Sequence, residues 1–264
     1  MKRVLTVLLF LVAASATAQV TVGTVGTVHT KAASTSDSWS FTMPTGSNLY
    51  LVLACTVGNS ASVVTMNNYP TWNGSNMTLI GKTANASSPY DASYLWGIVN
   101  PTTGAQTLAY GSNVSTDFTC MAISFAGVNQ STPTTNYTGT TGNSTGDVSI
   151  TITGTNSNDL FIDEVASDDN TLTCTGCPSP QTSRGNNNTL ELLGVSTAPG
   201  SSSNQSMGWS QNTSAIWAHG GAVIQAAGGA TSTPTATNTR NRIHIGDLIR
   251  TPLPVEVVST RWKE

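Results

Sequence analysis

The residues of this chain best suited to chemistry are the carboxylates of an acidic segment, residues 159–170. At its end, Asp168, Asp169 and Asn170 supply the hard oxygen ligands that calcium prefers. Two carboxylates facing each other across a cleft would instead suit a glycosidase. Asp and Asn also form turns where a strand ends, and this structural interpretation is favoured over both. The sequence therefore predicts no metal, no cofactor, no catalytic residue and no enzyme.

The histidines give little support to catalysis. His29, His219 and His244 are the only three, and none lies in a recognised nucleophile or metal-binding motif. His219 follows Trp217 by two residues in an apolar segment. We therefore expect His219 to be a half-buried residue of a sheet rather than a general base.

The four cysteines are expected to be structural. Cys174 and Cys177 have CxxC spacing but lie in a Thr/Gly/Pro-rich loop, without the strand and helix that a redox motif requires. We predict a small loop-closing disulfide there, and a zinc site would need a second ligand pair. Cys55 and Cys120 each lie in an apolar strand, where they either form a bridge between neighbours or stay as buried thiols.

The aromatic residues divide into core and surface candidates. Four tryptophans in alternating strands are expected in the core: Trp39, Trp96, Trp209 and Trp217. Tyr69 and Trp72 flank an Asn-Gly turn and Tyr90 lies in a loop, so these three form the predicted exposed platform on which a sugar ring could stack. Abundant Asn, Thr and Ser would supply hydrogen bonds, although such residues also cover ordinary secreted sandwiches.

The N-terminus has the features of an export signal. A basic start, Met1–Arg3, precedes an apolar run from Val4 to Val12, and Ala16-Thr17-Ala18 fits the rule for cleavage before Gln19. The apolar run is too short to span a bilayer, which needs roughly 20 residues. The sequence predicts a chain that is secreted or carried on the outer cell surface, with no membrane span.

Charge is sparse and unevenly distributed. Only 9% of residues are charged. From Gln19 to Asn238 there are three basic and ten acidic side chains, a net charge of −7, whereas the segment from Thr239 onward has five basic and three acidic ones, a net charge of +2. An acidic body argues against nucleic-acid binding. The opposite signs favour docking of the C-terminal segment onto a body.

Apolar residues recur with the period of two that is typical of strands, and Thr, Ser, Asn and Gly dominate between them. The run from Leu49 to Val57 is almost continuously apolar, as expected of a central strand covered on both faces. We predict a single all-β domain, an antiparallel two-sheet sandwich resembling a jelly roll, without an internal repeat. The expected strands are 20–28, 39–43, 49–57, 63–66, 77–80, 92–99, 106–110, 118–125, 148–152, 160–165, 190–195, 205–210 and 215–224.

Four segments occur in an order that is similar to a known family: Trp72-Asn73-Gly74-Ser75-Asn76-Met77-Thr78-Leu79, Asn100-Pro101-Thr102-Thr103-Gly104, Ala122 to Gln130, and Trp217 to Gln225. They resemble the "(Y/W)NG-x-x-(M/L)TL", "NPxTG", "SFxGVxQ" and "W-A-x-x-x-A-V-I" segments of a family of secreted bacterial and phage-associated β-sandwich domains. The resemblance covers roughly residues 60–226. It implies the fold and carries no catalytic residues over.

The C-terminal segment is separated from the body by small, tether-like residues. The predicted organisation is a signal peptide (1–18), a sandwich (19–226), a linker (227–239) and a basic, apolar, strand-like tail (240–264). The tail has too few residues for a core and needs a sheet edge to pair with. Its Leu253-Pro254-Val255-Glu256-Val257-Val258-Ser259 resembles the segment that precedes sorting domains in exported Bacteroidota proteins, with Thr260 in place of a Phe. The expected assembly residues are Ile243, Ile245, Leu253, Val255 and Val257.

These observations favour a non-catalytic structural protein of the cell surface, which self-associates into a filament or surface layer, or attaches to the surface, by adding its tail to a sheet edge. One alternative is a carbohydrate-binding or adhesive module whose partner is a polysaccharide. Another is a secreted glycan hydrolase built on the acidic segment. Pairing of the tail within one chain or between chains fits the sequence equally well.

Overall fold

The structure is a computed structural model, which describes residues 18–58, 61–66, 68–88, 90–168, 171–177 and 180–228. The chain divides after Ala230 into two units, and every described residue belongs to the first. Nearly all of the predicted signal peptide, most of the linker and the whole tail with its assembly residues therefore lie outside the described residues.

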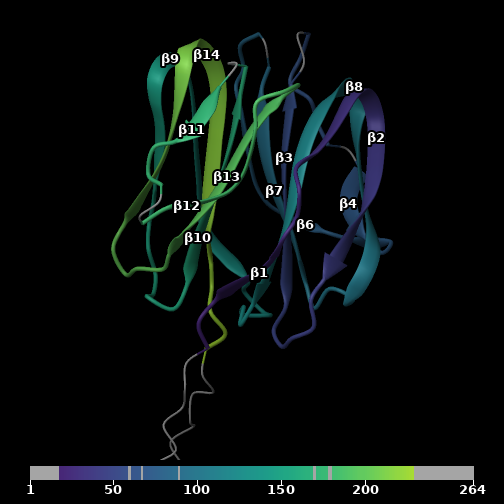
Figure 1. Ribbon diagram of the computed structural model, residues 1–264, viewed down its shortest axis with the longest axis vertical. Coiled ribbons are helices and arrows are strands. Elements are labelled where there is room, and N and C mark those ends of the chain that lie inside the picture. Colours follow the sequence, from purple (N-terminus) through teal and green to yellow (C-terminus); the bar gives the residue numbers. More distant parts are fainter. Residues whose placement is uncertain are drawn as a thin grey trace, which may run out of the picture. The chain divides into compact units, whose positions relative to one another are not determined.

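All regular structure in the described residues is β-strand, in two packed antiparallel sheets (Figure 1), which confirms the predicted all-β sandwich. The first sheet contains β1 (Thr21–Val25), β2 (His29–Met43), β3 (Tyr50–Gly58), β4 (Asn68–Trp72), β5 (Ser75–Asn76), β6 (Thr78–Ala84), β7 (Ala92–Val99) and β8 (Gly104–Ala126). The second sheet contains β9 (Thr134–Ile152), β10 (Leu160–Ser167), β11 (Leu172–Cys174), β12 (Thr182–Asn187), β13 (Leu192–Pro199) and β14 (Gln205–Ile224).

Each sheet is formed by one half of the chain, and the two sheets share a common strand order. The first follows the order β4-β8-β3-β7-β6, with β2 also paired to β8, and the second follows β11-β14-β10-β13-β12, with β9 also paired to β14. The registers correspond: Tyr50 pairs with Val99 and Phe125, as Leu160 pairs with Pro199 and Ile224. The structure thus contains an internal repeat, and the sequence-based prediction of none is wrong.

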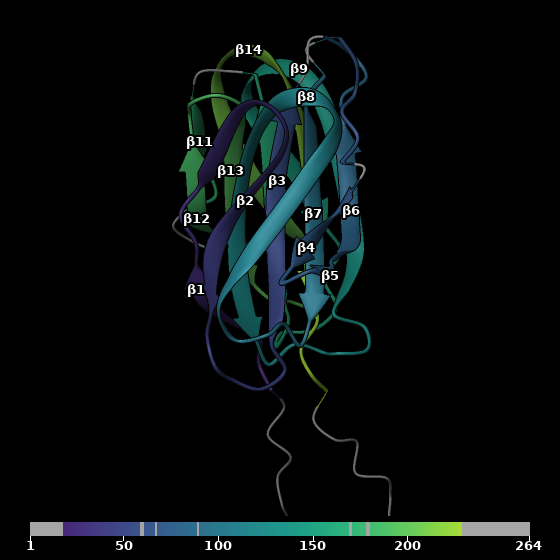
Figure 2. The ribbon, with the colours of Figure 1, turned by 90° about the vertical axis from the view of Figure 1, so that its right-hand side faces the viewer.

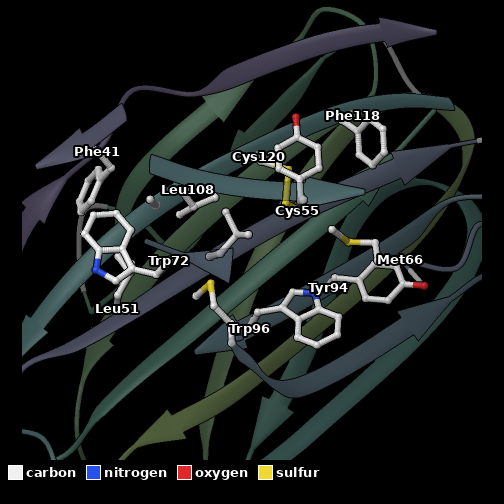
Figure 3. Close-up of a cluster of buried hydrophobic side chains, with 14 of the residues drawn as sticks. Phe41, Leu51, Cys55, Met66, Trp72, Tyr94, Trp96, Leu108, Phe118 and Cys120 are labelled. Carbon is white, nitrogen blue, oxygen red and sulfur yellow. A yellow bond between two sulfur atoms is a disulfide. The ribbon is translucent and has the colours of Figure 1, made fainter. Parts of the chain in front are cut away.

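The central strand of each sheet is buried on both faces. In β3, Leu51 and Leu53 belong to the outer core with Leu108 of β8, whereas Val52 belongs to the core between the sheets with Ile162 of β10. The second half of β2, paired with the first half of β8, covers the outer core. Figure 2 shows β8 crossing obliquely over β3. Figure 3 shows this cluster around the labelled Trp72, Trp96 and Leu108. The prediction that 49–57 is a central strand covered twice is confirmed.

The second half repeats this arrangement. In β10, Phe161 and Val165 lie in outer clusters with residues of β9 and β14, and Ile162 faces the first sheet. Long bent strands make the double cover possible: β8 and β14 each run through two segments that the sequence predicts as separate strands. The irregular pairing near Gln211–Ala215 of β14 marks one bend. Polar residues at such bends interrupt the apolar pattern, which is why the sequence predicts two short strands.

The Asn-Gly turn lies where the sequence places it, but it joins β4 and β5, and the strand predicted at residues 63–66 is not formed. Asn73 and Gly74 both have positive φ, 48° and 77°, as a type I′ turn requires. Trp72 pairs with Ser75 across this turn. Glycine and asparagine tolerate the left-handed conformation, so the Asn-Gly pair determines the hairpin.

Both candidate disulfides are present. Cys55 and Cys120 are directly opposite on β3 and β8 and are bonded, and Cys174 is bonded to Cys177. Such bonds persist in oxidising compartments. In the part of the chain that the structure describes, no helix has the length and apolar character to cross a membrane.

We expect the two disulfides to differ in their contribution to stability. Their sequence separations are 65 and 3 residues, and loop-closure entropy predicts losses of about 4 and about 1.5 kcal/mol, respectively, when they are removed. Urea denaturation of the Cys55→Ala/Cys120→Ala and Cys174→Ala/Cys177→Ala variants measures this difference. Equal losses for the two variants would contradict the chain-entropy explanation.

Candidate binding grooves

A groove with a volume of about 440 Å³ lies beside β6, an edge strand of the first sheet. The side chain of Leu79 is 41% exposed at this edge. The other lining groups combine apolar residues with hydroxyls: Tyr50, Ile98, Val99, Pro133, Thr78 and Thr134. The groove extends from β6 across β7 to Tyr50 of β3, and residues 130–134 form its other wall. In the described residues β6 pairs only with β7, so its second edge has no strand partner.

The rim of the groove is held by the segments that resemble the secreted family. The amide of Gln130 donates to the carbonyl oxygens of Leu49 (3.2 Å) and Val128 (2.8 Å), and its side-chain oxygen accepts from the Asn100 N–H (3.1 Å). The Trp72 Nε1–H donates to the carbonyl of Thr102 (3.1 Å). These contacts join three of the four segments at one end of the first sheet, and thus give their residues a structural role.

Tyr137 of β9 closes the space beyond the groove. Its hydroxyl is hydrogen bonded to Thr83 Oγ1 (2.8 Å), and its ring lies against Gly81 so closely that a Cβ there would clash. Burial raises the pKa of Tyr137, so the phenol stays protonated. The accessible part of the β6 edge is therefore its beginning, residues 78–80.

The internal repeat produces a second groove, with a volume of about 400 Å³. Leu160, Thr197, Ala198 and Pro199 line it at the positions that correspond to Tyr50, Gly97, Ile98 and Val99 in the first groove. Residues 19–22 replace residues 131–134, and Arg184 of β12 adds a cation. The two grooves thus have related backbones and different side chains.

The predicted aromatic platform is not formed as a set. Trp72 is only 1% exposed because its ring packs against Phe41 (6.0 Å between centroids) in the outer core, which corrects the expectation that it is on the surface. Tyr90 is half-buried in a loop. Tyr69 alone is well exposed, at 57%, with its ring edge-on to Trp96 (5.7 Å). It borders a third hollow of about 420 Å³ with Asn76, Met77, Thr78 and Leu79.

The tryptophans that were expected in the core are there. Trp96, Trp209 and Trp217 are buried, and Trp39 is half-buried and packs against the outer core of the first sheet. His29 stacks on Trp39 (4.6 Å between centroids), and its Nε2 lies 2.6 Å from Asp37 Oδ2.

The acidic segment is mostly part of the core. Asp163 is fully buried and accepts hydrogen bonds from Ser196 and from Trp209 Nε1 (3.0 Å), with His219 Nε2 at 2.9 Å. These residues correspond by the repeat to apolar ones: Asp163 to Leu53 and His219 to Cys120. His219 is therefore more buried than predicted, and a substrate cannot reach this Asp–His–Ser set. The interpretation of the segment as solvated is wrong for Asp163 and Glu164.

The other predicted calcium ligands are only partly described. Asp168 is exposed directly after β10, and Asp169 and Asn170 lie outside the described residues. Among the residues described, no group of three or more His, Cys, Asp or Glu side chains is arranged to hold a metal ion.

Comparison of the chain with models of protein families, with curated proteins and with solved structures finds no match. The resemblance to the secreted sandwich family and to the sorting segment therefore stays a prediction.

Sequence reasoning did not find either groove. Their lining residues come from strands far apart in the chain, and most are the ordinary Thr, Val and Ile of a sheet. The sequence offered one signal, the apolar residue Leu79 in the predicted strand 77–80. The structure leaves this side chain exposed, although the apolar pattern of the strand suggests burial.

The buried Asp163 network gives a prediction about stability. Asp163→Ala leaves the donors of Ser196, Trp209 and His219 without their acceptor in the core, so we expect a loss of about 3 kcal/mol or more of unfolding free energy. Asp163→Asn keeps one acceptor and the size of the side chain and should lose less. Urea denaturation measures both, and a loss below about 1 kcal/mol for Asp163→Ala would contradict the assigned role.

Proposed function

We propose that this is a secreted, non-catalytic structural protein, which assembles by adding its C-terminal segment to the β6 edge of a neighbouring copy. The observation that carries the proposal is the groove beside Thr78–Ile80 of β6, a strand whose second edge has no partner among the described residues. The export signal at residues 1–18 and the two disulfides support a location outside the reducing compartment.

The groove has the chemistry that an added strand needs. An edge strand offers unpaired main-chain donors and acceptors, and alternate side chains of the incoming strand enter adjacent pockets. Leu79, Ile98 and Val99 give the groove apolar walls. In an added strand, residues two positions apart such as Val255 and Val257 would point to the same side, and they match such walls in size and polarity.

Charge and chain position also support the tail as the occupant. By formal count the body carries a net charge of −7 and the tail +2. Burial raises the pKa of Asp91, Glu164 and Glu191 and so reduces the negative charge of the body, but the two parts still have opposite signs and attract one another. The last described residues lie beside the groove: the Gln225 N–H donates to the carbonyl of Pro133 (2.9 Å), which lines the groove. About 25 residues connect Gly228 to Leu253 and, as a flexible chain, span roughly 25–30 Å on average, enough to reach an adjacent copy.

Head-to-tail addition of this kind uses two different surfaces on each copy. Such contacts propagate into an open filament unless the rotation closes a ring. The proposal therefore extends to a filament or a surface layer outside the cell.

We expect the mature full-length chain to form larger species as its concentration rises, and a chain truncated after Gly229 to stay monomeric. Leu79→Lys should prevent assembly of the full-length chain because it places a charge in the groove wall. Val25→Lys is the matched control, since Val25 is similarly exposed (37%) on a different strand. Sedimentation velocity with negative-stain microscopy measures the result. Full-length and truncated chains that are both monomeric would overturn the proposal, and assembly that survives Leu79→Lys would exclude this groove.

A second candidate function, carbohydrate binding, is favoured by the exposed ring of Tyr69 beside the polar groups of Asn76 and Thr78. Aromatic rings stack on sugar faces while amides and hydroxyls bind the ring substituents. If the hollow binds a polysaccharide, Tyr69→Ala should weaken binding about tenfold or more in a glycan array. The control is Tyr90→Ala, because Tyr90 is half-buried away from this hollow. Unchanged binding by Tyr69→Ala would exclude the hollow.

A further inference from the structure

Two carboxyl groups lie together at the end of the sandwich opposite to the two grooves. Asp91 directly precedes β7 and Glu191 directly precedes β13, so the two residues occupy corresponding positions in the internal repeat. Ala92 pairs with Val57, so Asp91 lies beside Gly58 at the end of β3, and the carboxyl group of Glu191 lies against the same glycine. The repeat thus brings one carboxyl group from each half of the sandwich to a common place.

Both carboxyl groups are buried, and no ion pair of the described residues compensates their charge. Asp91 is 0% exposed and Glu191 8% exposed. Within the described chain, neither carboxylate oxygen of Asp91 nor Oε1 of Glu191 has a hydrogen-bond partner outside this pair of carboxyl groups. The side chain of Glu191 lies against Gly58 so closely that a Cβ there would clash. A buried carboxylate without partners is costly, and a protein normally neutralises it.

The surroundings add negative charge rather than positive. Burial, followed by the charge of Asp168, raises the pKa of Asp91 to about 8. Burial raises the pKa of Glu191 well above its ordinary range, and Asp91, Asp168 and Asp117 raise it further. The ion pairs of the described residues, His29 with Asp37 and His219 with Asp163, involve neither group. Among these residues no basic side chain is therefore paired with the two carboxyl groups.

We propose that Asp91 and Glu191 bind one divalent cation with the chemistry of calcium, which joins the two halves of the sandwich at this end. Calcium accepts carboxylate, main-chain carbonyl and water oxygens in a flexible arrangement of six to eight ligands. Two carboxylates supply at most four of these oxygens, so main-chain carbonyl groups and water would have to complete the shell. This site differs from the one that the sequence suggests at residues 168–170, and it is independent of the tail.

The first experiment adds CaCl₂ or EDTA to the mature full-length chain at pH 7.5 and measures the melting temperature. We expect calcium at saturating concentration to raise it by about 5 °C or more. Asp91→Asn and Glu191→Gln should abolish this rise, whereas Asp147→Asn, which removes an exposed carboxylate from β9, should keep it. Terbium luminescence titrated against the wild-type chain provides a second reading that does not depend on the variants, with calcium as the competitor.

The pH dependence separates a cation from a proton. A carboxyl group whose pKa is higher in the folded state favours folding at low pH, and this advantage is lost as the pH rises through about 8. With bound calcium the loss should disappear, so profiles in EDTA and in calcium should diverge above about pH 5. Identical profiles, together with no terbium signal, would overturn the proposal and show that a shared proton neutralises the pair.

Discussion

The burial of both faces of the two central strands is the constraint on which the rest of the structure depends. β3 and β10 carry apolar side chains on both faces. Each sheet must therefore be covered on one face by the other sheet and on its outer face by another part of the chain. The outside cover comes from the long ribbons β2–β8 and β9–β14, which bend over the outer faces of their own sheets. The same solution used twice is what produces the repeat, and with it the paired grooves and the meeting of Asp91 with Glu191.

Local patterns predicted the parts of this fold that depend on local physics. The apolar run of Leu49–Val57 indicated a strand buried on both sides, and Asn73-Gly74 indicated a hairpin, because both depend on a few adjacent residues. The repeat could not be found in the same way. Corresponding positions differ chemically: Leu53 corresponds to Asp163, and the bonded pair of Cys55 and Cys120 corresponds to Val165 and His219. Equivalent positions in the two halves are thus occupied by unlike residues, which pack in one half and form hydrogen bonds in the other. The two halves share only their strand order.

The candidate sites were harder to predict than the fold for a related reason. Trp72 beside an Asn-Gly turn was expected on the surface. Its side chain is instead buried, because the indole N–H donates to the carbonyl of Thr102 and the ring packs against Phe41. The grooves and the carboxyl pair depend on residues about 30 to 180 positions apart, such as Tyr50, Leu79 and Thr134, which a linear pattern cannot bring together. Burial of Asp91 and Glu191 follows from their place in the repeat and not from their neighbours in the chain.

The assignment of each sheet to one half of the chain also bears on the order in which the protein folds as its chain is made. Residues 21–126 contain every partner strand of the first sheet, so this half can complete its hydrogen bonding and the Cys55–Cys120 bond before the second half emerges. Until then, Val52, Ile123 and Phe125 face solvent instead of the second sheet. If the N-terminal half folds first, the inner face of the first sheet stays uncovered until residues 134–224 fold onto it, and the short connection from Gly127 to Pro133 keeps the second half close enough to cover that face quickly.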